Sequence, residues 1–189
     1  MTASRRRWAW VLGALVVGLM LFAGLRLASS DDGASRSSPM VEGGFFDGFG
    51  RVSFSILPAG DTMTPAQRCA LLAAEEAARQ RGLMSARSLD GFAGMLFRFD
   101  QDTETGFFMK DTPMPLAIAW FDATGGFVGS TDMEPCLGQL SCPSYYAPRP
   151  FRFALEVPAG GLTELGAGPG SRLAVGAPGC HTPLESWGP

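Results

Sequence analysis

Lys110 and Asp111 stand side by side in GFFMKDTPMPLAIAWF (residues 106–121), a stretch that is otherwise almost wholly apolar. A cation and an acid beside aromatic side chains could belong to a site for an anionic or carbohydrate ligand. Neighbouring residues on a strand point to opposite faces, so the two side chains can share a site only where the strand ends, before Thr112 and Pro113. The alternative is that the pair ends the strand and protects its edge.

The four cysteines are Cys69, Cys136, Cys142 and Cys180. In an exported domain an even number of cysteines predicts disulfides. Cys136 and Cys142 would close a loop of roughly seven residues, worth about 2.4 kcal/mol in the chain-entropy model. Cys69 and Cys180 are then left for each other, and their loop of about 112 residues would contribute about 4.8 kcal/mol. A zinc site that also includes His181 is the alternative, although the short Cys-x-x-Cys unit is missing.

Other signatures of catalysis or metal binding are weak. His181 is the only histidine and lies in a tail rich in Pro and Gly, so a Ser-His-Asp or Cys-His apparatus has no evident scaffold. The segment DQDTETG offers Asp100, Asp102 and Glu104, with Asp111 further on, which faintly resembles a calcium loop. Its glycine falls one position late and strands flank it, which favours a solvated hairpin loop. We predict no metal and no cofactor.

Composition limits the class of protein. The chain has 189 residues, of which 46% are hydrophobic and 17% charged, as expected for one domain plus an additional apolar segment. The formal net charge of -3 leaves no basic surface to neutralise phosphates. A nucleic-acid partner would therefore lack its main electrostatic driving force.

The N-terminal residues 1–28 predict a transmembrane signal-anchor. Three arginines at positions 5–7 precede an uncharged run at 8–25, and a helix of that length spans about 27 Å, close to the hydrocarbon thickness of a bilayer. The positive-inside rule places the arginines in the cytoplasm and the rest of the chain outside. Signal cleavage near Ala28, which would give a secreted protein, is the alternative. Residues 29–50, rich in Ser, Asp and Gly, predict a flexible linker.

Residues 51–177 predict a β-rich exported domain, followed by a tail at 178–189. RVSFSI (51–56) alternates apolar and polar residues, as a half-buried strand does. A helix is expected over Pro65–Arg81, with Thr64 as its N-cap and Gly82 as its stop. About seven strands and one helix predict a β-sandwich or partly closed barrel with the helix packed on it. The remaining strands are expected at 94–99, 106–110, 115–122, 126–133, 151–157 and 172–176.

Five motifs recur in an order and spacing that closely resemble one family, domain of unknown function 192, also called uncharacterised protein family 0127. They are RGLMSARSLDGFAGMLFRFD, FFMKDTPMPLAIAWFDATG, MEPC, CPSY and FALEVPAG. The resemblance covers roughly Val52 to Val175. It implies a compact, mostly β, jelly-roll-like domain that is often exported and has no established activity.

The resemblance also points to individual positions. The family pattern has an Arg after Gly-Leu-Met, here Arg87; a Lys-Asn pair, here Lys110 and Asp111; and a Glu in the Leu-Glu-Val strand, here Glu156. Together with Phe108 these are the candidate ligand-binding residues. If their polar side chains converge in one concave pocket, a small-ligand site or an enzyme is favoured; if they are dispersed, a protein-binding or structural role is favoured.

This chain departs from the family at two acidic positions. Ala117 stands where relatives carry Asp after Pro-Leu, and Ser171 stands where they show Gly-Asp near the last strand. Ala117 and Ser171 have no carboxylate, so this chain cannot perform carboxylate chemistry at those two positions. The segment Pro65–Arg81 is, in addition, unusually long for the family.

Two functions fit these observations. The first is a non-enzymatic, membrane-anchored module of the bacterial envelope that binds a ligand, such as a carbohydrate, or an envelope protein. The second is an enzyme that acts on an envelope polymer or small molecule through Arg87, Lys110, Asp111 and Glu156. No known catalytic signature supports the second, so we expect the first.

Overall fold

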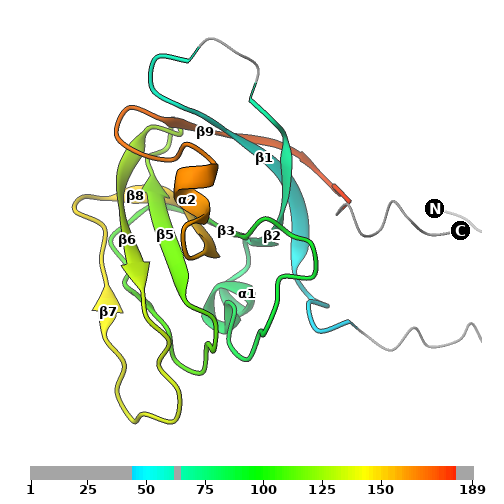
Figure 1. Ribbon diagram of the computed structural model, residues 1–189, viewed down its shortest axis with the longest axis vertical. Helices are drawn as coiled ribbons and strands as arrows, with labels where there is room; N and C mark the ends of the chain where they lie inside the picture. Colours follow the sequence, from blue (N-terminus) through cyan, green and yellow to red (C-terminus); the bar gives the residue numbers. More distant parts are fainter. Residues whose placement is uncertain (1–43, 62–64, 182–189) are drawn as a thin grey trace, which may run out of the picture. The chain divides into compact units, whose positions relative to one another are not determined.

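A curled seven-stranded sheet organises residues 44–61 and 65–181, the part of the chain that the computed structural model describes (Figure 1). The hydrogen-bonded order of its strands is β6-β5-β8-β3-β2-β1-β9, and β4 pairs with β7 in a separate two-stranded sheet. The strands are β1 (Gly50–Leu57), β2 (Arg68–Ala73), β3 (Met95–Thr103), β4 (Phe107–Phe108), β5 (Leu116–Phe121), β6 (Phe127–Met133), β7 (Ser144–Tyr145), β8 (Phe151–Pro158) and β9 (Arg172–Pro178). The helices are α1 (Glu76–Arg81) and α2 (Gly161–Glu164).

The two ends of this sheet meet at one corner. The turn before β6 contacts the start of β9, where the amide of Phe127 donates to the Ser171 carbonyl at 3.1 Å and the amide of Leu173 donates to the Gly125 carbonyl at 2.8 Å. The domain is therefore mainly β, as predicted, and the sheet forms a half-barrel. Of the two predicted architectures, the partly closed barrel is confirmed and the jelly-roll-like sandwich is not, because a single seven-stranded ladder runs continuously from β6 to β9.

The predicted helix over Pro65–Arg81 is wrong before Glu76, where α1 begins. Residues Arg68–Ala73 form β2, which pairs antiparallel with β1 and parallel with β3, and α1 covers only the last six residues of the range. Leu71 and Ala70 are both buried and join the cores on opposite faces of the sheet. The Ala- and Leu-rich composition favours a helix locally, but backbone pairing with β1 on one side and β3 on the other outweighs that preference. Gly82 ends α1 as predicted, its amide donating to the Ala78 carbonyl at 2.9 Å.

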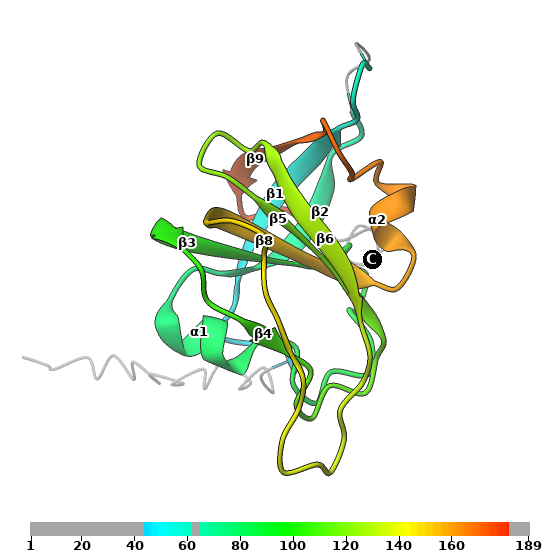
Figure 2. The ribbon, with the colours of Figure 1, turned by 90° about the vertical axis from the view of Figure 1, so that its left-hand side faces the viewer.

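Both faces of the sheet are covered. Figure 2 shows α1 and β4 on one side of the sheet and α2 on the other. Beneath α1 and β4 lies a core that includes Phe97, Phe107 and Trp120. Beneath α2 lies a second core that includes Phe121 and Leu155. The chain thus buries two apolar layers around one sheet.

β5 is buried along its whole length, as its unbroken apolar sequence predicts. It lies between β6 and β8, and α2 packs on one of its faces. The predicted hairpin turn at Thr124–Gly126 joins it to β6, and the amide of Gly125 donates to the Asp122 carbonyl at 2.9 Å.

The predicted anchor at 1–28 and most of the predicted linker lie outside the described residues. Residues 44–49 of that linker are described, and Phe46 and Phe49 pack against the core beneath α1. Arg81 connects this segment to α1, because its guanidinium donates to the carbonyls of Phe45 and Asp47 and lies over the Phe49 ring. No helix in the described part of the chain is long and apolar enough to cross a bilayer.

Candidate functional site

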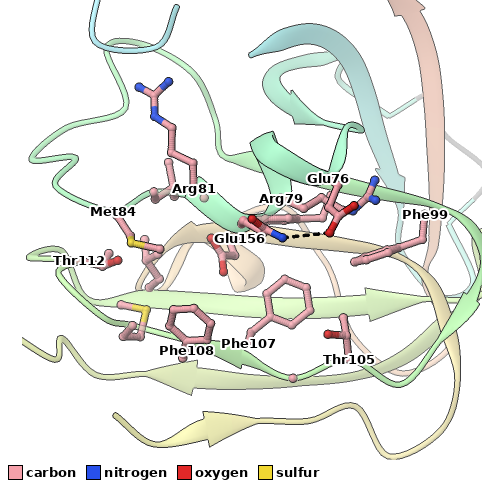
Figure 3. Close-up of a pocket in the computed structure, with 17 residues that line it drawn as sticks. Glu76, Arg79, Arg81, Met84, Phe99, Thr105, Phe107, Phe108, Thr112 and Glu156 are labelled. Atoms are coloured by element: carbon pink, nitrogen blue, oxygen red, sulfur yellow. Dashed lines mark hydrogen bonds between the residues drawn. The ribbon is translucent and has the colours of Figure 1, made fainter. Parts of the chain in front are cut away.

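A pocket of about 310 Å³ opens between α1 and β4 (Figure 3). We call it the α1–β4 pocket. Most of its wall is apolar, and the principal side chains in that wall are Phe97, Phe99, Phe107, Phe108, Met84 and Met109. The volume falls at the lower end of the range typical of small-molecule sites, about 300–1,000 Å³.

Glu156 brings a carboxyl group into this apolar pocket. It lies on β8 between Met95 of β3 and Ile118 of β5, both fully buried, and its own exposure is 5%. Figure 3 shows its side chain projecting into the pocket between α1 and the rings of Phe107 and Phe108. Among residues 44–61 and 65–181, none forms a hydrogen bond or ion pair with its carboxyl group.

Burial raises the pKa of Glu156 to about 8. The cause is desolvation, because the carboxylate loses its water shell inside an apolar wall. At neutral pH the side chain is therefore mostly protonated and uncharged. In this form it offers one O–H donor and one carbonyl acceptor to whatever enters the pocket.

The other charged residues that line the pocket, Glu76, Arg79 and Arg81, all come from α1. Arg79 donates to the backbone carbonyls of Ala74 and Arg98 and stacks on the Phe99 ring. The Arg81 guanidinium donates hydrogen bonds to the carbonyls of residues 45 and 47. The two guanidinium groups thus fix the helix in place, and the interior of the pocket is left to Glu156.

A second hollow, of about 440 Å³, lies beside Cys69 and includes Arg68, Glu164 and His181. These three side chains are exposed to solvent. The charged side chains of this hollow are exposed, whereas the α1–β4 pocket contains the buried carboxyl group of Glu156, so the α1–β4 pocket is the stronger candidate.

The model of the DUF192 family, described as Uncharacterized ACR, matches residues 60–175, more than half of the 189 residues. The chain belongs to the DUF192 family. This confirms the resemblance inferred from the motifs. No curated protein matches the chain significantly.

Two solved structures share the DUF192 fold seen here. One is a protein from Sinorhizobium meliloti 1021 proposed to be a transcription regulator, with 24% identity, a TM-score of 0.57 and alignment over 67% of this chain and 95% of that one. The other is a protein of unknown function from Novosphingobium aromaticivorans DSM 12444, with 22% identity, a TM-score of 0.53 and alignment over 67% of this chain and 84% of that one. At these identities the likeness extends to the fold alone.

The structure brings together two of the five ligand-binding residues predicted for this DUF192 domain. Glu156 and Phe108 both line the α1–β4 pocket. Arg87, Lys110 and Asp111 are exposed and do not line it. The four polar candidates therefore do not converge in this pocket, which is the arrangement expected for a protein-binding or structural role, and a ligand-binding role for these three stays a prediction.

Asp111 nevertheless has a clear structural setting beside the pocket. Its backbone is left-handed, with φ 54°, a conformation that Asp and Asn tolerate better than most residues do. Its amide donates to the Cys136 carbonyl at 2.9 Å, and its carbonyl accepts from the Ser85 amide at 2.7 Å. The strand β4 ends at Phe108, before the Lys-Asp pair, and Asp111 joins the loop after α1 to the Cys136 loop.

Both predicted disulfides form. Cys69 bonds to Cys180 across a sequence separation of 111 residues, and Cys136 bonds to Cys142 across 6. The described cysteines are all oxidised, so a zinc site built on their thiolates is ruled out. Cys69 lies on β2 rather than on the predicted helix, and the first bond fastens the C-terminal segment to that strand.

The calcium-loop alternative is also wrong. Asp100 and Asp102 belong to β3 rather than to a loop, and Asp102 pairs with Arg152 on β8 at 3.0 Å. No group of three or more potential metal ligands is found within the described ranges.

Sequence reasoning missed the role of α1 as one wall of the site, and with it Met84 and Arg79. For Glu156 a usable signal exists in FALEV (153–157), where an acid is the only polar residue in a five-residue run of a buried strand. A charged residue in such a strand must be paired or have a shifted pKa, and both outcomes mark a site worth testing.

Proposed function

We propose that this DUF192 domain is a non-enzymatic module that binds a small molecule in the α1–β4 pocket, on the outer side of the cytoplasmic membrane. The observation that carries the proposal is the Glu156 carboxyl group, 5% exposed and without a partner among the described residues. A buried polar group without a partner reduces stability. Its retention is best explained by a ligand that completes its hydrogen bonds.

Binding accounts for the pocket better than catalysis does. General acid-base or nucleophilic chemistry needs a second reactive group next to the first. The other hydroxyl deep in the site, on Thr112, already donates to the Lys110 carbonyl at 3.3 Å. The charged groups of α1 are held in backbone contacts or lie at the helix surface. Glu156 is thus left without a catalytic partner.

The proposed location follows from the disulfides and from the N-terminal sequence. Two disulfides are typical of an oxidising compartment. The uncharged run at 8–25, preceded by three arginines, supports an anchor that delivers the domain outside. Although one structural relative is proposed to be a transcription regulator, the net charge of -3 argues against DNA as the ligand of this chain.

The test is a binding screen on the full-length protein reconstituted in lipid nanodiscs. A panel of small amides, amines, carboxylic acids and monosaccharides is scored by the rise in melting temperature. We expect at least one class to stabilise the wild type and to fail with Met84→Trp, which fills the pocket. The exposed Glu164→Gln serves as the matched control and should behave like the wild type. Hits that survive Met84→Trp, or turnover of a hit, would contradict the proposal.

A further inference from the structure

We infer that the α1–β4 pocket takes an uncharged ligand that presents a carboxamide-type group, an adjacent N–H and C=O, to Glu156 and an apolar body to the phenylalanines. This inference rests on the proposed function and names the chemical class of its ligand. Three properties of the pocket lead to it: the hydrogen-bonding capacity of its buried carboxyl group, the shape of its apolar wall, and the lack of any ion pair between its other charged residues and that carboxyl group.

The hydrogen-bonding capacity of Glu156 is matched by an amide. A neutral carboxyl group has one O–H to donate and one carbonyl oxygen to accept with, side by side. A carboxamide has the complementary pair, so two parallel hydrogen bonds satisfy both groups together. No donor or acceptor from the described residues is needed to complete the pair, and none is present at Glu156.

A charged ligand would leave more hydrogen-bonding groups in the pocket without a partner than an amide would. An ammonium group would require Glu156 to ionise, and a buried ion pair is stable only when further hydrogen bonds satisfy the remaining oxygen lone pairs. The described residues supply none of those bonds. An anion would be desolvated in the same apolar wall and would meet a single O–H donor.

The apolar wall favours a flat ring. Phe97 and Phe107 meet edge to face with their centroids 5.1 Å apart, and Phe108 is 47% exposed at the margin of the pocket. Rings in this arrangement accept another ring by edge-to-face or offset contact. A pocket of about 310 Å³ has room for a ring that carries one small polar group.

The other charged residues of the pocket do not pair with the carboxyl group. The charged residues that line the pocket besides Glu156 are Glu76, Arg79 and Arg81, all on α1, and burial is the cause of the high pKa of Glu156. The outer charges can therefore influence the approach of an ion without pairing with Glu156. An uncharged ligand should bind with an affinity that barely changes with salt.

The experiment compares benzamide, benzamidine and benzoate, which share one shape and carry charges of about zero, plus one and minus one at neutral pH. Binding to the full-length protein in nanodiscs is measured by ligand-detected NMR at several pH values. At pH about 7 we expect benzamide to bind more tightly than benzamidine and benzoate. Its affinity should fall about tenfold for each pH unit above about 8, as Glu156 ionises. Tighter binding of benzamidine or benzoate at pH about 7 would overturn the inference, as would the absence of benzamide binding.

Two variants separate a binding role from a structural one. Glu156→Gln keeps an adjacent donor and acceptor, so it should still bind benzamide within a few-fold of the wild type, with no pH dependence. Glu156→Leu removes both groups and should weaken benzamide at least tenfold. Equal binding by Glu156→Leu would overturn the inference. If the pocket prefers a cation and Met84→Trp abolishes that binding, the proposed function stands and only the ligand class is wrong.

Discussion

The backbone of Gly94 lies so close to Glu156 that a Cβ atom on Gly94 would stand 2.2 Å from the Glu156 carbonyl oxygen. Gly94 also accepts the Leu71 amide at 3.0 Å, which fixes the start of β3 against β2. The strand β8, which carries the pocket carboxyl group, thus packs against Gly94, a position that only glycine can occupy. The fold and the site are coupled at this one contact.

Replacing Gly94 with alanine should destabilise the protein by about 2–4 kcal/mol, because the clash is with backbone and β8 must shift away from β3. The measurement is urea unfolding followed by tryptophan fluorescence. Gly168→Ala is the matched control, since a Cβ there meets nothing within 4 Å. A loss at Gly94 no larger than at Gly168 would show that the two strands are not held this closely.

The two disulfides should differ in their contributions. In the chain-entropy model, Cys69–Cys180 stabilises by about 4.8 kcal/mol and Cys136–Cys142 by about 2.4 kcal/mol, because the first closes the longer loop. The double variants Cys69→Ala/Cys180→Ala and Cys136→Ala/Cys142→Ala, compared by urea unfolding, give the two values. The reverse order would mean that native-state contacts, rather than loop entropy, decide.

Strands with regular alternation or unbroken apolar runs could be predicted from the sequence. Val52, Phe54 and Ile56 mark β1, and the continuous run from Leu116 to Phe121 marks β5, because burial on one or both faces leaves a direct trace in residue type. The disulfides followed from elimination once export was assumed. These features depend on local chemistry, which the sequence records.

Features that depend on distant partners were harder to predict. Arg68–Ala73 is helical by composition and becomes β2 because β1 and β3 flank it in the sheet. Closure of the half-barrel depends on Gly126 meeting Arg172, which are remote in sequence. In the pocket, Glu156 could be named from the sequence, but the helix opposite it could not, since the position of α1 depends on the pairing of β2 with distant strands.

The turn between β5 and β6 should depend on pH through Asp122. Its Oδ1 accepts from the amides of Thr124 and Gly126 and from the Thr124 hydroxyl at 2.7–2.9 Å. Partial burial acts to raise the pKa of Asp122, but these hydrogen bonds, with Arg149, outweigh it and lower the pKa below 3.8. The stabilisation is therefore present above pH 3.8 and is lost as the pH falls through the lower, folded-state pKa.

Asp122→Ala should accordingly cost about 1–3 kcal/mol at neutral pH, and the cost should shrink in strong acid. Chemical unfolding at pH about 7 and about 2.5 measures it. The exposed Asp132→Ala is the control. A cost that is the same at both pH values would rule out ionised Asp122 as its source.

Glu156 should make stability depend on pH in the opposite direction to Asp122. Its folded-state pKa of about 8 lies above the ordinary value of 4.5, so the folded protein holds the proton more tightly than the unfolded chain does. Stability is then greatest below pH 4.5 and falls as the pH rises toward about 8. Glu156→Gln does not titrate at this position. Its stability relative to the wild type should rise by up to about 5 kcal/mol between pH about 4.5 and about 8, as unfolding titrations can show. A constant difference would contradict a buried, unpaired acid.

The most direct measurement is the titration of the Glu156 side chain itself. Carboxyl carbon chemical shifts of full-length protein labelled with ¹³C at glutamate, recorded in nanodiscs without ligand, report the pKa of each glutamate. We expect one resonance to titrate at about 8 and to vanish in Glu156→Gln. If every glutamate titrates below about 5, Glu156 is ionised and solvated, and the pocket is not built around a neutral carboxyl group.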